Sequence, residues 1–140
     1  MKHELFQPEA ELLDALIAEP SAILLRRLVL SRLSRVATPF VHDECFTFGI
    51  FDDLMHAVTP SGAFTLLPAA LDVAHSEKSL DRFTCALALV ATLAQHSDTT
   101  QQPSALLQLW PEFIARVSAF SSAHDAALQL QSIKDWYRIQ

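Results

Sequence analysis

The densest group of side chains that could do chemistry lies between residues 42 and 56. It comprises two histidines and four carboxylates: His42, Asp43, Glu44, Asp52, Asp53 and His56. Asp52 and Asp53 stand four and three residues before His56, so on a helix a carboxylate and the imidazole would share one face. The same spacing recurs at Asp72 and His75, and two such pairs could together bind a divalent metal.

Metal binding and nucleophilic catalysis both lack further support in the sequence. The chain has no H-E-x-x-H, E-x-x-H or G-x-S-x-G pattern. An acidic helix N-terminus beside a loop explains Asp52 and Asp53 without a metal. Cys45 lies three residues from His42, but no third group is placed to orient that pair. We therefore predict no enzymatic activity, no metal and no cofactor.

Phenylalanines are interleaved with these acids, and four of them fall between residues 40 and 51. Aromatic side chains rimmed by charge are typical of a protein interface, and an acidic rim would steer a basic partner toward it. A plug at one end of a helical core would have the same composition, so both interpretations stay open. As an interface, the segment would use Asp43, Glu44, Phe46, Phe48, Phe51, Asp52, Asp53 and His56.

A second charged feature is basic. Residues 21–42 contain no acid and four arginines, Arg26, Arg27, Arg32 and Arg35. The whole chain has a net charge of −6, which argues against nucleic-acid binding. The arginines could bind a phosphate or an acidic partner. Alternatively, they pair with carboxylates of a neighbouring helix, for which the candidates are Glu9, Glu11, Asp14 and Glu19.

Helices must position all of these residues. A chain of 140 residues, 51% hydrophobic and with two glycines, fits one domain and argues against both disorder and an all-β fold. Apolar spacing predicts helices over 8–18, 21–36, 63–75, 104–120 and 123–137, and one that is capped by Ser76 or Ser79 and runs to about residue 95. Pro68 should bend the third helix or mark its true start. A loop or extended chain is expected over 37–51, a short helix from about Asp52 and a turn at 59–62.

We expect one all-α domain spanning residues 1–140. Six to eight short helices would form either a compact bundle or an irregular two-layer array of the HEAT or armadillo type. The second helix should be largely buried, because Ile23, Leu28 and Leu30 cover more than a narrow stripe. No secretion signal or membrane span is visible, and Cys45 and Cys85 are expected to be thiols, which predicts a cytoplasmic protein.

A small, acidic, all-helical chain without a catalytic signature resembles the immunity proteins of bacterial toxin systems, which protect the cell that produces a contact-delivered or type VI effector. The segments VHDECFTFGIFDDLMH, LLQLWPEFIARV and IKDWYRIQ carry the resemblance. It implies stoichiometric neutralisation of a cognate toxin by occlusion of its active site. Phe46, Phe48 and Phe51 would be anchors, and the four nearby carboxylates would supply complementary charge.

The alternative is a non-enzymatic helical scaffold or adaptor that binds peptides or partner proteins in the groove of a helical array. An immunity protein has one tight partner, whereas an adaptor has many weak ones. Neither function calls for a nucleic acid or a membrane. A homodimer is compatible with both, because leucine-rich helix faces also make dimers.

Overall fold

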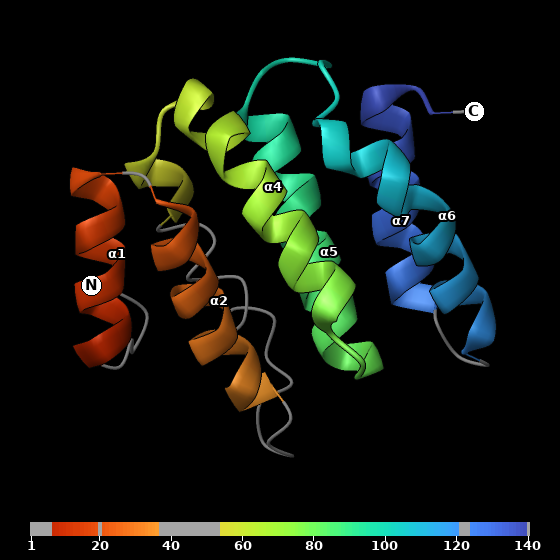
Figure 1. Cartoon of the computed structure of the whole chain (residues 1–140), viewed down its shortest axis with the longest axis horizontal. Coiled ribbons are helices and arrows are strands. Elements are labelled where there is room, and N and C mark those ends of the chain that lie inside the picture. The colour runs from red at the N-terminus through yellow and green to blue at the C-terminus, as the bar shows by residue number, and fades with distance from the viewer. Residues whose placement is uncertain (1–6, 20, 37–53, 121–123, 140) are drawn as a thin grey trace.

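The computed structural model describes residues 7–19, 21–36, 54–120 and 124–139 (Figure 1). These residues contain a helical turn at 54–57 and no strand, which confirms the predicted all-α class. The helices are α1 (Gln7–Ala18), α2 (Ala22–Val36), α4 (Pro60–Ser76), α5 (Leu80–His96), α6 (Ser104–Ala119) and α7 (His124–Tyr137). None of the helices in the described ranges is both long enough and apolar enough to cross a membrane.

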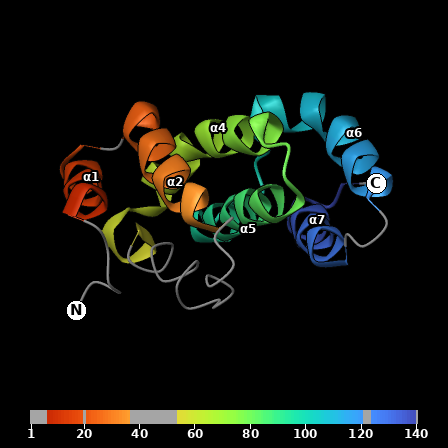
Figure 2. The same ribbon diagram turned by 90° about the horizontal axis from the view of Figure 1, so that it is seen from below.

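The helices lie in two layers (Figure 2). One layer contains α2, α4 and α6, the other contains α5 and α7, and α1 packs beside α2 at one end. Figure 1 shows that α2, α4 and α6 run in one direction, while α5 and α7 run in the opposite direction. The hairpins α4–α5 and α6–α7 therefore stack side by side. This arrangement matches the two-layer array rather than a simple bundle.

Helix α5 occupies the centre, in contact with α2, α4 and α7. The three- and four-residue apolar spacing of its sequence predicts one stripe, Leu80, Phe83, Leu87, Val90 and Ala94. All of these are buried except Leu80, which is half-buried. The structure also buries positions on the other sides of this helix, namely Ala86, Ala88, Leu89, Ala91 and Leu93. A helix with neighbours on several sides must be apolar nearly all round.

The prediction that α2 is largely buried was wrong. Leu25, Leu28 and Val29 are buried, but Ile23 is 66% exposed and Leu30 is 41% exposed. Helix α2 lies in an outer position with α1, α4 and α5 as its neighbours. Its apolar residues outnumber the positions that these neighbours cover.

Helix α4 begins three residues before the predicted start, so the expected turn at 59–62 is a helix N-terminus. Thr59 is the N-cap, and its Oγ1 accepts a hydrogen bond from the Gly62 N–H at 3.0 Å. Pro60 occupies the first turn, where a missing N–H has no cost. Pro68 lies inside α4 on its exposed side and does not end the helix. Ser79 caps α5 in the same way, by accepting from the Arg82 N–H.

Candidate functional site

A groove lies between α2 and α4 on one face of the array. It has a volume of about 470 Å³ and is open to solvent. Its lining residues are Ala22, Ile23, Arg26 and Arg27 of α2 and Pro68, Ala69 and Asp72 of α4. The guanidinium of Arg26 forms an ion pair with the Asp72 carboxylate, and both side chains are about half exposed. Arg27 is exposed and has no ion pair to any described residue.

For Arg26, this ion pair decides between the two interpretations of the arginines, binding of a partner and pairing within the protein. Arg26 does pair with a carboxylate of a neighbouring helix, as predicted, but that carboxylate is Asp72 of α4 rather than an acid of the first helix. The side chains of Arg32 and Arg35 lie outside the described part of the chain. The structure therefore leaves Arg27 as the cation in the groove that is open to a partner.

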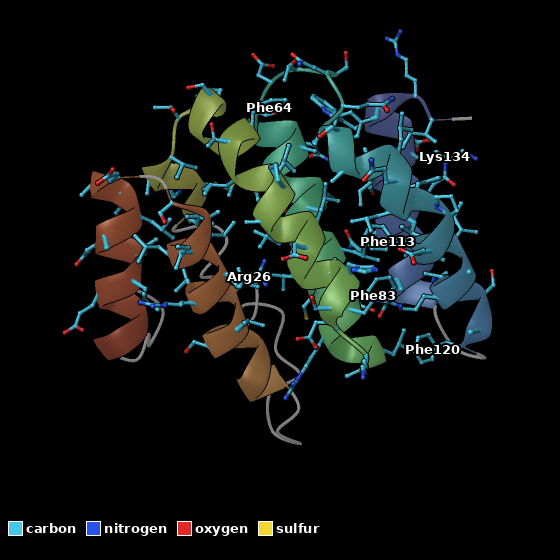
Figure 3. All side chains as sticks on the ribbon, viewed as in Figure 1. Arg26, Phe64, Phe83, Phe113, Phe120 and Lys134 are labelled. Atoms are coloured by element: carbon cyan, nitrogen blue, oxygen red, sulfur yellow. The ribbon has the colours of Figure 1, made fainter. Side chains whose placement is uncertain are left out.

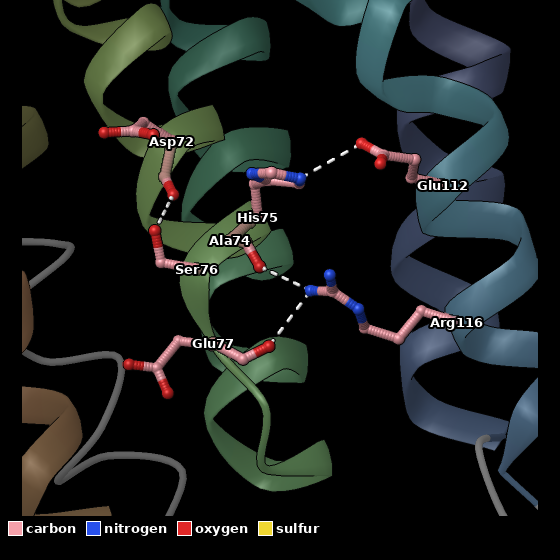
Figure 4. A network of polar contacts seen from close by, with 7 residues as sticks. All are labelled: Asp72, Ala74, His75, Ser76, Glu77, Glu112 and Arg116. Atoms are coloured by element: carbon pink, nitrogen blue, oxygen red, sulfur yellow. Dashed lines mark hydrogen bonds and ion pairs between the residues drawn. The ribbon is translucent and has the colours of Figure 1, made fainter.

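The predicted Asp72–His75 pair does not converge on a metal position. Asp72 faces α2, while the His75 Nε2 lies 3.0 Å from the Glu112 Oε2 of α6 (Figure 4). Within the described ranges, no group of three or more histidine, cysteine or acidic side chains is placed to hold a metal ion. Each member of the pair instead contacts a different neighbouring helix.

Arg116 of α6 forms the main polar contact with the C-terminal end of α4 (Figure 4). Its Nη1 donates to the carbonyl oxygens of Ala74 at 3.1 Å and of Glu77 at 3.0 Å. Carbonyls at a helix C-terminus lack partners within their own helix, and a cation also complements the negative end of the helix dipole. Arg116 therefore caps α4 from a neighbouring helix.

The same guanidinium lies over an aromatic pair that links α5 to α6. It is 5.0 Å from the centroid of the Phe83 ring, and the rings of Phe83 and Phe113 are 5.7 Å apart (Figure 3). The sequence did not single out Arg116. Its position in the last turn of a helix is a signal for a cationic cap, but its actual partners are backbone carbonyls of another helix.

Polar contacts also join the elements at the opposite end of α5. The His96 Nε2 lies 2.8 Å from the Val58 carbonyl oxygen, and the Trp136 Nε1 donates to the Thr99 carbonyl oxygen at 3.0 Å. Because a carbonyl only accepts, Nε2 of His96 carries the proton in this contact. The next residue after Trp136, Tyr137, is buried. Burial raises the pKa of its hydroxyl to about 12.

Of the eight residues predicted to form the interface, one is described. His56 lies in the helical turn at 54–57 and is exposed, while Leu54 of the same turn is buried. The other seven, Asp43, Glu44, Phe46, Phe48, Phe51, Asp52 and Asp53, lie outside the described residues. The choice between an interface and a core plug for these phenylalanines stays a prediction.

No protein-family model, curated protein or solved structure gives a significant match to this chain.

Proposed function

We propose that this chain is a bacterial immunity protein that binds a cognate toxin and blocks its active site stoichiometrically. The observation that carries the proposal is the way the acidic–aromatic segment of residues 43–56 ends. Leu54 and Val58 are buried, and His96 contacts the Val58 carbonyl oxygen at 2.8 Å, whereas His56 between them is exposed. A surface that is fixed to a core and still presents side chains to solvent suits tight binding, since less conformational freedom is lost on association.

Charge supports the same proposal. The net charge of −6 would steer the chain toward a basic cleft, such as the active site of a toxin that acts on nucleic acid or nucleotides. The polar side chains His75, His96 and Arg116 support a non-enzymatic role, because each is engaged in a contact between helices. The scaffold or adaptor function is the alternative, and the groove between α2 and α4 is the feature that favours it.

Capture with the proteins of neighbouring genes tests the proposal. The tagged full chain is co-expressed with each of these proteins, and the molar mass of each purified complex is measured by light scattering. We expect one partner in a fixed ratio that stops growth when it is expressed alone and is harmless together with this chain. Several weak partners in no fixed ratio would contradict the proposal and favour the adaptor.

Charge reversal tests the segment itself. Asp52→Lys combined with Asp53→Lys should weaken binding of the captured toxin by about tenfold, because like charges would then face its basic cleft. The matched control combines Glu19→Lys with Asp135→Lys, two exposed acids, one directly after α1 and one on α7, whose reversal changes the net charge equally. Calorimetric titration measures both affinities. Equal affinities for the two folded double variants would contradict the assignment of Asp52 and Asp53.

A further inference from the structure

We propose that the groove between α2 and α4 is a separate docking site for an acidic segment of a partner protein. The partner would insert one large apolar side chain and place carboxylates beside Arg27 and Arg26. Its lining residues belong to residues 22–27 and 68–72, so the site shares no residue with the proposed toxin-binding segment of residues 43–56.

Apolar exposure marks the groove as a place where binding would remove surface from water. Ile23 is 66% exposed although it is a large aliphatic residue, and Pro68 opposite it is also exposed. Ala69, which also lines the groove, is buried. Apolar surface rimmed by charge is typical of protein-binding sites.

The size and openness of the groove indicate the kind of occupant. The lining part of α2 spans residues 22–27, which is about 8 Å of helix axis at 1.5 Å per residue. That length accommodates one large side chain rather than an extended peptide. Small-molecule sites enclose most of their ligand. An open groove with an apolar lining instead suits a protein segment, which covers the remaining surface itself.

Charge complementarity indicates that the partner's segment is negatively charged. The lining contains two guanidiniums and one carboxylate. Arg26 pairs with that carboxylate, and Arg27 forms no ion pair with another residue that the structure describes. Figure 3 shows Arg26 between α2 and α4, on a helix that has no acidic residue. Outside α2 the chain holds six basic and sixteen acidic residues, Asp72 among them, so an acidic partner is repelled elsewhere and attracted to α2. Guanidiniums also bind carboxylates in a defined two-bond geometry.

Labelled peptides test the site on the full chain. The probes are a set of helix-forming peptides, each with one Phe, Leu or Ile that has glutamates three and four residues away on both sides. Fluorescence anisotropy measures affinity, and amide NMR shifts map the contact. We expect binding below about 1 mM with shifts at residues 22–27 and 69–72. Replacing the glutamates by glutamine should weaken binding by about tenfold.

Matched variants separate the groove from general effects. Arg27→Gln and Ile23→Ala should each weaken peptide binding by about threefold to fivefold, since both side chains line the groove and are exposed. Arg138→Gln and Ile114→Ala, at exposed positions outside the groove, should leave it unchanged. The Asp52→Lys and Asp53→Lys double variant should also bind the peptides normally, so the outcome is separable from that of toxin binding.

Three results would overturn the inference. The first is the absence of binding by every peptide at about 1 mM, and the second is binding that Arg27→Gln does not weaken more than Arg138→Gln. The third is concentration-dependent self-association in sedimentation that Arg27→Gln abolishes. That result would identify a second copy of this chain as the occupant instead of an acidic partner.

Discussion

Arg116 shows how one side chain can join three helices. It lies on α6, donates to two carbonyl oxygens at the end of α4, and places its guanidinium over Phe83 of α5. Cationic donors form stronger hydrogen bonds than neutral ones, and the aromatic face adds a further attraction. The neighbouring His75–Glu112 contact is more exposed, so it contributes less to the same junction.

We predict that Arg116→Met lowers the free energy of unfolding by about 2–3 kcal/mol, because two charged hydrogen bonds and the ring contact are lost. Arg116→Lys should recover only part of this, since an ammonium could still donate to the carbonyls but lacks the flat guanidinium that lies over the Phe83 ring. Urea denaturation measures the effect. Arg27→Met, at an exposed position, is the control and should change stability by less than about 0.5 kcal/mol. A similar small change for Arg116→Met would show that the junction does not depend on it.

In contrast to Arg116, Tyr137 carries a buried polar group without a hydrogen-bond partner among the described residues. Burial raises the pKa of its hydroxyl from 10.0 to about 12. The folded state therefore favours the neutral phenol. Ionisation of this group leaves the free energy of unfolding unchanged below pH 10 and lowers it as the pH rises toward 12, because the unfolded chain ionises first.

Tyr137→Phe should therefore raise the free energy of unfolding at pH 7, by about 1 kcal/mol, because no buried hydroxyl is left unpaired. Above pH 10 the difference between the two proteins should grow further, by at most about 1.4 kcal/mol per pH unit. The chain has one tyrosine, so tyrosinate absorbance reports this residue directly. A midpoint near 10 in the folded protein would contradict the buried, unpaired hydroxyl.

Helix α4 shows how capping and burial together define an element. It contains Gly62 and Pro68, two residues that weaken helices, yet it extends over 17 residues. Nine of its residues are buried, including Leu66, Leu67 and Leu71. Burial of this apolar face offsets the weak local preference, because most of the stability of a helix in a protein comes from its packing.

The N-cap of α4 is the local feature that sets its first residue. Thr59→Ala should cost about 1 kcal/mol of stability, since the Gly62 N–H loses its side-chain acceptor. Thr65→Ala in the exposed middle of α4 is the control and should have little effect or be slightly stabilising, because alanine is the better helix former. Thermal unfolding followed by circular dichroism compares the two. An equal loss of stability in the two variants would show that the Thr59 cap does not stabilise the start of α4.

The two-layer array as a whole depends on α5. The helix contacts α2, α4 and α7, so a defect in its core positions is felt in both layers. The outer residues of α7, by contrast, face solvent, and Leu128 there is 51% exposed. We therefore expect stability to be concentrated at the centre of the array and to fall toward its ends.

Leu87→Ala in α5 should lower the free energy of unfolding by about 3 kcal/mol, because the side chain is fully buried and leaves a cavity. Leu128→Ala should cost less than about 0.5 kcal/mol. Urea unfolding monitored by tryptophan fluorescence and by circular dichroism gives both values. Coincident transitions would also support the prediction of one domain over residues 1–140, whereas two separate transitions would contradict it.

The position of the helices could be read from the sequence to within a few residues. In α7, for example, the helical spacing of Ala126, Leu130, Ile133 and Tyr137 predicts one core-facing side, and all four residues are buried. Helical periodicity is a local property of the chain, and so are the serine that caps α5 and the prolines at helix starts. The error at the start of α4 has a local cause as well, because Thr-Pro-Ser-Gly fits both a turn and a capped helix start.

The identity of the neighbours was beyond the sequence. An apolar stripe shows that a face is buried but not against which helix, so it predicted neither the burial of α5 on several sides nor the exposure of Ile23 on α2. The sequence suggested four acids within residues 9–19 as partners for the arginines, and Asp72 was not among them. Only the packing of α2 against α4 places Asp72 beside Arg26. The groove and the Arg116 junction arise in the same way, because they consist of residues that meet only when separate helices pack together.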